Sequence, residues 1–351
     1  MKTPSSSHYT IGIDLGDRKH AICVLDRDGN AILECFINND RDDIESFFHE
    51  YPKALVAMEV GMHSPWLSRF IEELGHRVLV ANARKLRAIY ENPRKSDKKD
   101  ALMLAKLARA DESLLSPIEH RSERSQQDLL QIKLRDNLVR QRVNIISSVR
   151  FTLKSLGIKT RSPKTAYFTR HLRKQLEETN SGTLALVEPS LRVIDEITNQ
   201  VKELDKSIET MAKERYPETQ FLSQITGVGA LTSLTFVLTV EDPNRFKRIR
   251  DVGSYLGLVP RRDQSGEVDK ELRISKSGDR YLRTLLVNAA HYVLGPFGPG
   301  CELKRHGLKL SERGGARAKK KAVIAIARKL SVLMLTLWKN ESDYEVEHQT
   351  A

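Results

Sequence analysis

Four carboxylates occupy positions from which they could hold metal ions. Asp14 lies in an alternating apolar segment, so its side chain is expected on the opposite face from its apolar neighbours. Glu59 ends the buried run 54–58, and Asp97 and Asp100 are three residues apart on one face of a predicted helix. Carboxylates that are brought together repel one another unless they are protonated or bridged by cations, and oxygen-only ligands suit Mg²⁺ or Mn²⁺. The four residues are therefore predicted to form a metal site for phosphodiester transfer.

Each of these acidic residues has an ordinary structural explanation when it is considered alone. Asp97 could cap a helix, and Asp100 could pair with a neighbouring lysine. The ordered combination of a mid-strand Asp, a strand-end Glu and a helical Asp pair favours the metal site.

The elements around the carboxylates follow a recognisable order. Apolar periodicity predicts three antiparallel strands, then a helix, a strand, a helix, a strand and a last helix. The predicted bounds are 11–15, 21–25, 31–37, 42–51, 54–58, 65–74, 77–81 and 97–110. This order is typical of an α/β ribonuclease H-like (RuvC-like) domain, in which the first and fourth strands are neighbours and the late helix covers them. The four carboxylates are then expected to converge.

The middle of the chain has a helical period. Apolar residues follow one helical face over 122–156, and a short heptad pattern runs from Val187 to Met211. The segment between them interrupts the helix, so we expect an antiparallel hairpin or an interaction arm. Packing within one chain and a coiled coil between two chains are both consistent with this pattern.

The charge of the chain favours a polyanionic partner. Lys and Arg number 58 against 46 Asp and Glu, which gives a formal net charge of +12. Between residues 245 and 283 there are eleven basic residues against six acidic ones, and between 301 and 330 there are ten against two. Contact with nucleic-acid phosphates is the economical explanation.

The cysteines, the N-terminus and the most hydrophobic segment bear on the cellular compartment of the protein. Three widely spaced cysteines without a Cys-x-x-Cys pair argue against a disulfide framework and agree with a reducing cytoplasm. The polar N-terminus has no apolar signal-peptide core. The most hydrophobic window, 322–338, contains Arg328 and Lys329, so it is predicted to be a packed amphipathic helix and not a membrane span.

A serine in the last part of the chain is a candidate nucleophile. This part begins near Phe221 and is predicted to be mainly helical to about residue 339. Ser265 lies in a Pro- and Gly-containing segment, 257–266, which we expect to be a loop between helices, with Arg261 and Arg262 just upstream. Cationic side chains can stabilise the charge that develops when a hydroxyl attacks a phosphate. Without further information, a turn residue is the ordinary explanation of Ser265.

Two further groups of residues are candidates for nucleic-acid binding. Gly227-Val228-Gly229 resembles a helix-hairpin-helix turn, whose backbone N–H groups can hold a phosphate, although a tight helix connection explains it equally well. The basic residues expected at a nucleic-acid face are Arg261, Arg262, Lys276, Arg280 and Arg283, with Lys319, Lys320 and Lys321.

Several short motifs together resemble one known family. Ile11-Gly12-Ile13-Asp14, Met58-Glu59 and Lys95-Ser96-Asp97-Lys98-Lys99-Asp100-Ala101 look like the acidic motif of the DEDD transposases of insertion sequences, which resemble the RuvC resolvase and the Piv invertase. The later segments that resemble the family's transposase domain are 225–229, 255–260, 264–266, 274–278 and 282–283.

The resemblance implies a mechanism and a set of partners. It implies a site-specific DNA recombinase in which Asp14, Glu59, Asp97 and Asp100 bind the metal, and Ser265 forms a covalent DNA intermediate. Ser275 is the alternative nucleophile, because Gln264 replaces a hydroxyl residue that family members often carry. The resemblance also implies a composite site within a homo-oligomer, a dimer or tetramer, and a structured guide RNA. A nucleoid-associated protein of the bacterial or archaeal cytoplasm is expected.

The expected domain boundaries follow from these assignments. A RuvC-like metal-dependent domain is predicted over 1–115, a helical coiled-coil arm over 116–218, a mainly α serine-containing transposase domain over 219–340, and a polar tail over 341–351.

Three other functions remain open from the sequence. A RuvC-like two-metal endonuclease or junction resolvase would use the carboxylates without a covalent step. A sugar-kinase or Hsp70-type ATPase shares the Ile-Gly-Ile-Asp-Leu-Gly pattern but needs a duplicated phosphate loop, which we do not find. A non-catalytic DNA-binding protein would leave the four carboxylates unexplained.

Overall fold

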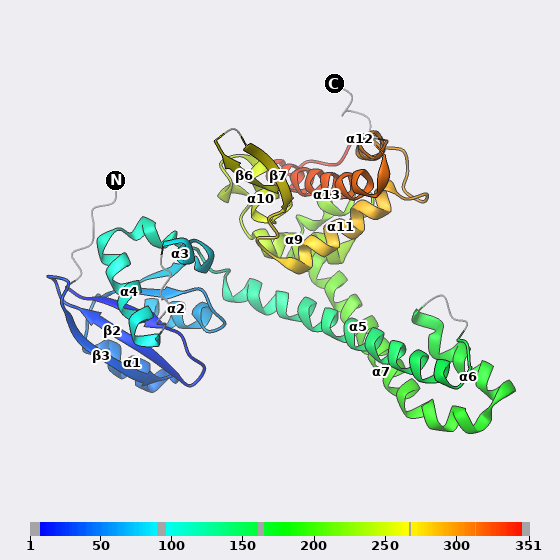
Figure 1. Cartoon of the computed structure of the whole chain (residues 1–351), viewed down its shortest axis with the longest axis horizontal. Coiled ribbons are helices and arrows are strands. Elements are labelled where there is room, and N and C mark those ends of the chain that lie inside the picture. The colour runs from blue at the N-terminus through cyan, green and yellow to red at the C-terminus, as the bar shows by residue number, and fades with distance from the viewer. Residues whose placement is uncertain (1–7, 90–95, 161–164, 267, 313, 346–351) are drawn as a thin grey trace. The chain divides into compact units, whose positions relative to one another are not determined.

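The computed structural model describes residues 8–89, 96–160, 165–266, 268–312 and 314–345 (Figure 1). The chain divides into two compact units, Met1–Arg121 and Ser122–Ala351, and each is described by itself. Lys95 of the acidic motif and the last six residues of the expected tail lie outside the described residues.

Unit 1 is a five-stranded mixed sheet with helices, in the element order that the periodicity predicts. Its strands are β1 Thr10–Asp14, β2 Lys19–Leu25, β3 Ala31–Asn38, β4 Leu55–Glu59 and β5 Arg77–Ala81. Its helices are α1 Arg41–His49, α2 Ser64–Glu73, α3 Ala83–Ile89 and α4 Asp97–Ala110. The strand order is β3-β2-β1-β4-β5, with β1 antiparallel to β2 and parallel to β4. The helix α3 lies in a segment for which the sequence predicts no element.

The strands β1, β2 and β4 bury both of their faces, whereas one face of the edge strand β3 is exposed. Ile11 and Ile13 of β1 pack with the buried side chains of α1 and α2, such as Phe48 and Ile71. On the other face, the small and aliphatic residues of β2, β4 and β5 pack against Ala101, Leu104, Ala105 and Ala108 of α4. Because side chains alternate along a strand, Gly12, Asp14 and Glu59 belong to the α4 face.

Gly12 lets α4 approach the sheet closely. A Cβ atom at Gly12 would lie 1.9 Å from the carbonyl oxygen of Ala101 and 2.7 Å from the backbone nitrogen of Ala105. At the other end of the helix, the Arg109 guanidinium donates to the carbonyl oxygen of Arg27, in the turn that follows β2. Since Leu25 of β2 pairs with Thr10, α4 runs antiparallel to β1, with its N-terminus at the Asp14 end.

Unit 2 begins with a helical arm. Its helices are α5 Glu123–Ser155, α6 Phe168–Thr179 and α7 Ser181–Arg215. Residues at heptad positions of α7, including Leu191, Ile194, Val201 and Ile208, are buried within the chain. Arg135 of α5 forms an ion pair with Asp205 of α7, with 2.8 Å between Nε and Oδ1. The heptad pattern therefore packs α7 against α5 of the same chain.

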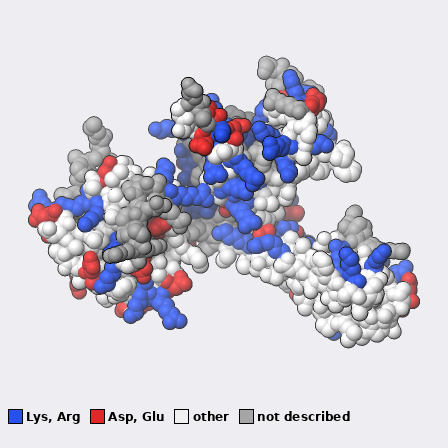
Figure 2. Space-filling model, viewed as in Figure 1, with Lys and Arg blue, Asp and Glu red and all other residues white. Residues whose placement is uncertain are grey.

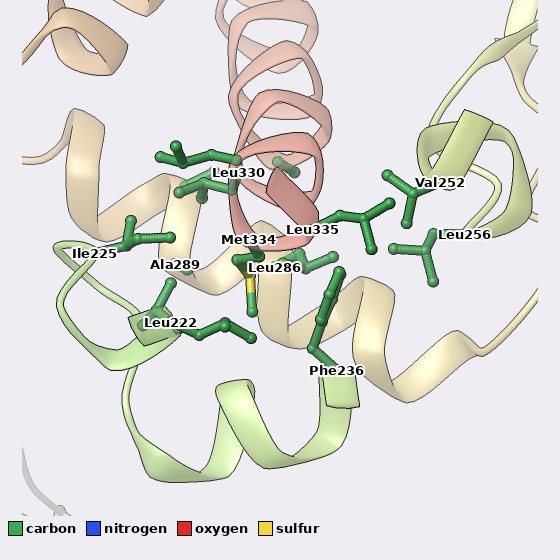
Figure 3. Close-up of a cluster of buried hydrophobic side chains, with 14 of the residues drawn as sticks. Leu222, Ile225, Phe236, Val252, Leu256, Leu286, Ala289, Leu330, Met334 and Leu335 are labelled. Atoms are coloured by element: carbon green, nitrogen blue, oxygen red, sulfur yellow. The ribbon is translucent and has the colours of Figure 1, made fainter. Parts of the chain in front are cut away.

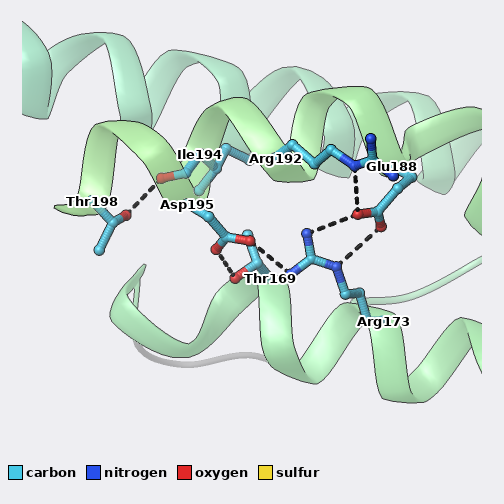
Figure 4. A network of polar contacts seen from close by, with 7 residues as sticks. All are labelled: Thr169, Arg173, Glu188, Arg192, Ile194, Asp195 and Thr198. Carbon is cyan, nitrogen blue, oxygen red and sulfur yellow. Dashed lines mark hydrogen bonds and ion pairs between the residues drawn. The ribbon is translucent and has the colours of Figure 1, made fainter. Parts of the chain in front are cut away.

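A polar network joins α6 to α7 near the end of the arm (Figure 4). The Arg173 guanidinium donates to both carboxylate oxygens of Glu188 at 3.0 Å and to Asp195 at 2.7 Å. These hydrogen bonds hold the pKa of Glu188 below its usual value. The network fixes α6 against α7 through three different side chains.

The rest of unit 2 is mostly helical around one core. Its elements are α8 Thr219–Ser223, α9 Ala230–Val240, α10 Val252–Tyr255, β6 Pro260–Ser265, β7 Val268–Ile274, α11 Arg280–Leu294, α12 Glu302–Ser311 and α13 Gly315–Asn340. Leu330, Met334 and Leu335 of α13 lie at the centre of this core, with Leu286 of α11 and Phe236 of α9 beside them (Figure 3). None of the helices in the described ranges is long and apolar enough to cross a membrane.

The β6–β7 hairpin corrects one expectation. Segment 257–266 was expected to be a loop between helices, but Pro260–Ser265 pairs with Val268–Ile274 as an antiparallel ribbon. The strand carries charged and polar residues and is fully exposed, so it has no apolar alternation from which a strand could be predicted.

The close approach of α4 to β1 gives a first prediction. Gly12→Ala should lower the free energy of unfolding by about 2 kcal/mol, because the backbone of α4 must move away from the added methyl group. Thermal unfolding by circular dichroism would measure this loss. Gly182→Ala is the matched control: space is available at that helical position, so its stability should be unchanged or higher. Equal unfolding temperatures for the two variants would contradict the assignment.

Candidate active site and basic groove

Asp14 and Glu59 end two neighbouring strands. Ile13 pairs with Met58 in the parallel β1–β4 ladder, so the next residues, Asp14 and Glu59, occupy adjacent positions at the carboxyl ends of the strands. Each is half-buried, whereas the residues before it are buried. The sheet thus places two carboxylates side by side on the face that α4 covers.

The first turn of α4 lies over the same edge. Asp100 is half-buried and precedes Ala101, whose carbonyl oxygen faces Gly12. Ser96 is the N-cap, so Asp97 is the first helical residue, and it is exposed. Lys98 lies over the Phe36 ring, 5.6 Å from its centroid, and Phe36 pairs with Ala21, the partner of Asp14. Both acidic residues of α4 therefore belong to the end of the sheet that carries Asp14.

The donor set at this edge fits a hard divalent cation. Four carboxylates provide oxygen ligands only, which is the preference of Mg²⁺ and Mn²⁺, and Gly12 creates the close approach that brings α4 to them. Within the described residues, however, no three His, Cys, Asp or Glu side chains are already arranged to hold a metal ion. The fold therefore fixes the backbone positions of the four acidic residues, but their side chains are not grouped as metal ligands.

A histidine network lies beside the carboxylates, and the sequence reading missed it. His20 is fully buried; its Nδ1 accepts from the Gly16 N–H at 3.3 Å and its Nε2 donates to Asn39 Oδ1 at 3.0 Å. Burial lowers the pKa of His20, which agrees with a neutral ring. His63 Nε2 donates to Asp17 Oδ1 at 3.0 Å. The network ties the loop after Asp14 to the loop after Glu59.

Ser265 lies at the end of β6, beside the hairpin turn. It pairs with Val268 and is exposed, and Gly266 adopts a positive φ of 54°. Since faces alternate along a strand, Arg262 lies on the opposite face from Ser265, where it approaches Asp269 at 4.0 Å. The register shifts between Pro260 and Arg262, so Arg261 stands at a bulge. The hairpin alone does not place Arg262 next to the hydroxyl.

The alternative hydroxyl, Ser275, follows β7. It is half-buried, and its Oγ lies 2.9 Å from Ser277 Oγ. Its backbone N–H donates to the Val259 carbonyl oxygen. Ser275 is thus part of the base of the hairpin, whereas Ser265 is near its tip.

Two glycines and an arginine hold the base of the hairpin. Gly257 and Gly278 have positive φ, and a Cβ on either would come within 2.4 Å of the facing backbone. The Arg283 guanidinium donates to the carbonyl oxygens of Leu256 at 3.0 Å and Ser277 at 2.8 Å. Arg283 is only 9% exposed, so its side chain is inside the protein rather than on a surface. Arg280 and Lys276 are exposed, as a nucleic-acid contact would require.

The Gly227-Val228-Gly229 turn joins α8 to α9. Val228 is buried in the core, while both glycines are exposed. Gly227 has a positive φ and packs against Ala289 of α11, and Gly229 is the N-cap of α9. The turn is therefore a tight helix connection with an accessible backbone.

A basic groove opens between β7, α12 and α13. Its volume of about 1670 Å³ exceeds that of ordinary small-molecule pockets and suits a polymer. Six of the basic residues that line it are Arg250, Arg273, Arg317, Lys320, Lys321 and Arg328. Figure 2 shows Lys and Arg gathered on this side of unit 2. Lys276, from the predicted nucleic-acid face, also lines the groove.

Few carboxylates neutralise this groove. Lys321 pairs with Glu271 and Lys329 with Glu302, each at 3.6 Å. Arg317, Lys321 and Arg328 are exposed and project from one face of α13. An excess of positive charge along a long groove is the arrangement that binds a phosphate backbone.

Two families of known proteins match this chain, one over unit 1 and the start of unit 2 and the other within unit 2. Residues 11–158 match a family described as a transposase of the DEDD type, and residues 219–299 match the transposase IS116/IS110/IS902 family. Together the two matches span more than half of the chain. The chain belongs to this family of transposases. The transposase is therefore an enzyme of DNA recombination, and DNA is its substrate.

Individual relatives support this assignment. A probable family 20 transposase of Pseudomonas aeruginosa is 27% identical over 81% of this chain and 83% of its own length. The transposase for insertion sequence element IS1111A of Coxiella burnetii is 26% identical over 95% of this chain and 90% of its own length. A pilin gene-inverting protein of Moraxella bovis is 33% identical, over 31% of this chain and 33% of its own length.

Arg280 and Arg283 give a matched pair for a second prediction. Arg283→Ala should lower the free energy of unfolding by about 2 kcal/mol, because the carbonyl groups that it holds lose a charged donor. Arg280→Ala should leave stability unchanged, because the side chain is exposed, and should weaken DNA binding. Thermal unfolding and a DNA-binding titration would separate the two roles. A stable Arg283→Ala protein with weakened DNA binding would reverse the assignment.

Proposed function

We propose that this transposase cuts and rejoins DNA with two sets of groups, the carboxylates of unit 1 and a serine of unit 2. The observation that carries the proposal is the common edge of Asp14, Glu59 and the first turn of α4. The strand order β3-β2-β1-β4-β5, with α4 over β1 and β4, supports the assignment of unit 1 to the ribonuclease H-like (RuvC-like) folds. We infer three functional parts: a metal-dependent domain over 1–115, a helical arm over 116–218 and a serine-containing transposase domain over 219–340.

Asp14, Glu59, Asp97 and Asp100 would hold the divalent cations, Mg²⁺ or Mn²⁺. When bound, such cations supply Lewis-acid activation of the attacking and leaving oxygens of a phosphodiester. The protein's own contribution is to fix the carboxylates: β1 and β4 hold two of them rigidly, and α4 supplies the other two from a helix N-terminus, which favours negative charge.

Ser265 would be the nucleophile. Its Oγ forms a bond to phosphorus as the bond from phosphorus to a deoxyribose oxygen breaks; the hydroxyl proton passes to a base and the leaving oxygen takes up a proton. The protein–DNA ester keeps the phosphodiester energy, so rejoining needs no ATP. The exposed position near a hairpin tip supports this role, because the hydroxyl is open to a phosphate.

The partners follow from the same assignment. We propose a homo-oligomer, a dimer or tetramer, in which the carboxylates of one subunit act with the serine of another. The groove of unit 2 would bind nucleic-acid backbone, both of DNA and of a structured guide RNA. Among the described residues, no Phe, Tyr or Trp side chain lines the groove and His306 is its one aromatic ring, which favours a paired backbone over stacked single-stranded bases.

The carboxylates give a third prediction. Asp14→Asn should abolish DNA strand cleavage while retaining the fold and most DNA affinity, because the chemistry depends on the carboxylates and the affinity on Lys and Arg. Cleavage of labelled element-end DNA, with binding measured in parallel, would test this. Asp42→Asn, at an exposed position of α1, is the matched control and should cut normally. Wild-type cleavage by Asp14→Asn would remove the basis of the proposal.

Ser265 gives a fourth prediction. Ser265→Ala should bind DNA normally but form no covalent protein–DNA adduct on a denaturing gel, because its only reactive atom is removed. If Ser275→Ala loses the adduct and Ser265→Ala does not, the nucleophile is Ser275. If both variants still cut the DNA and neither forms a covalent adduct, the protein acts as a two-metal endonuclease without a covalent step.

A further inference from the structure

The turn between β4 and α2 exposes an apolar side chain beside the candidate site. Met62 is 92% exposed, and Val60 in the same turn is 36% exposed. Both follow directly after Glu59, the last residue of β4. Water contact with an entire methionine side chain is unfavourable, and the described residues of unit 1 bury almost none of it.

The residues on both sides of Met62 are firmly held. The Gly61 N–H donates to Ser64 Oγ at 3.0 Å, and the same hydroxyl donates back to the Gly61 carbonyl oxygen at 2.9 Å. His63 Nε2 donates to Asp17, and His63 Nδ1 accepts from Trp66 Nε1 at 3.3 Å. The exposed methionine is therefore presented by a braced turn.

The position of Met62 relative to the carboxylates sets what it can reach. Three residues separate it from Glu59, so their Cα atoms are at most about 10 Å apart. Successive phosphates of one DNA strand advance by about 3.4 Å along the helix axis, so this distance covers the bases next to a phosphate held at the carboxylates. Arg18, in the neighbouring loop, and Lys19, at the start of β2, are exposed and can attract the adjoining backbone.

We propose that Met62 is a wedge that inserts between stacked bases next to the phosphate that is cut. Apolar side chains such as methionine insert between base steps in proteins that kink DNA, because the unstacked bases gain an apolar contact. Opening the stack would free one strand of the duplex to reach the carboxylates. The inference rests on the proposed function, since it requires the phosphate to be cut at Asp14 and Glu59.

The wedge gives a fifth prediction, made with the full chain in the assembly that cleaves element-end DNA. Met62→Ala should cut fully paired DNA more slowly, on the order of tenfold, because the cost of unstacking is no longer offset. DNA mismatched at the cleavage step should restore the rate, because its bases are already unstacked. A 2-aminopurine placed at that step should brighten with the wild-type protein and much less with Met62→Ala.

Matched variants separate the wedge from other roles. Met62→Leu should keep the activity, since it remains apolar, and Met62→Gln should lose it, although its length is similar. Leu186→Ala, at a 79% exposed position of α7, should behave as the wild type in the mismatch assay. Because Met62 is exposed, none of its variants should change the unfolding temperature.

Three results would overturn the wedge. Met62→Ala could cut paired DNA at the wild-type rate, or it could cut slowly on paired and mismatched DNA alike. It could also change the mass of the assembly in light scattering, in which case Met62 contacts a second copy of the chain. Asp14→Asn distinguishes these results from failure of the proposed function: if that variant is inactive while Met62→Ala is normal, only the wedge is wrong.

Discussion

The close contact of α4 with Gly12 of β1 is the constraint on which the acidic edge of unit 1 depends. Asp14 and Glu59 are fixed at adjacent strand ends, and α4 adds two more acidic residues at the same edge. Several contacts hold α4 in this place. The contact of α4 with Gly12, the packing of Ala101 and Ala105, and the bond from Arg109 to the Arg27 carbonyl do so. The fold thus brings the backbones of the four acidic residues to one edge of the sheet, where the proposed cations would bind.

In unit 2, the proposed nucleophile Ser265 lies on a hairpin that has no hydrophobic core of its own. The β6 strand is exposed along its entire length, and a two-stranded ribbon is marginally stable alone. Its base is fixed instead, by the facing glycines Gly257 and Gly278 and by the buried Arg283. A hydroxyl near the tip can then stay accessible while its position is defined.

Affinity and chemistry are carried by separate residues in the proposed mechanism. The groove of unit 2 collects basic side chains with few neutralising carboxylates, and the edge of unit 1 collects carboxylates. The braced turn with Met62 adds an apolar contact beside the acidic edge. In the proposed mechanism, one surface would bind the phosphate backbone and another would distort it.

The sequence by itself determined the elements of unit 1 other than α3, the packed α13 helix and the family, because apolar periodicity and short motifs are local signals. It also indicated Asp14 and Glu59 as neighbours, since the element order implies the strand order. Only the tertiary structure decided that β6 is a strand, that Arg283 is buried and that His20 and His63 join two loops. The sequence also left open whether α7 packs within one chain or against a second chain, and in the structure it packs against α5 of the same chain. These features depend on contacts between distant segments, and a pattern along one segment does not contain its partner.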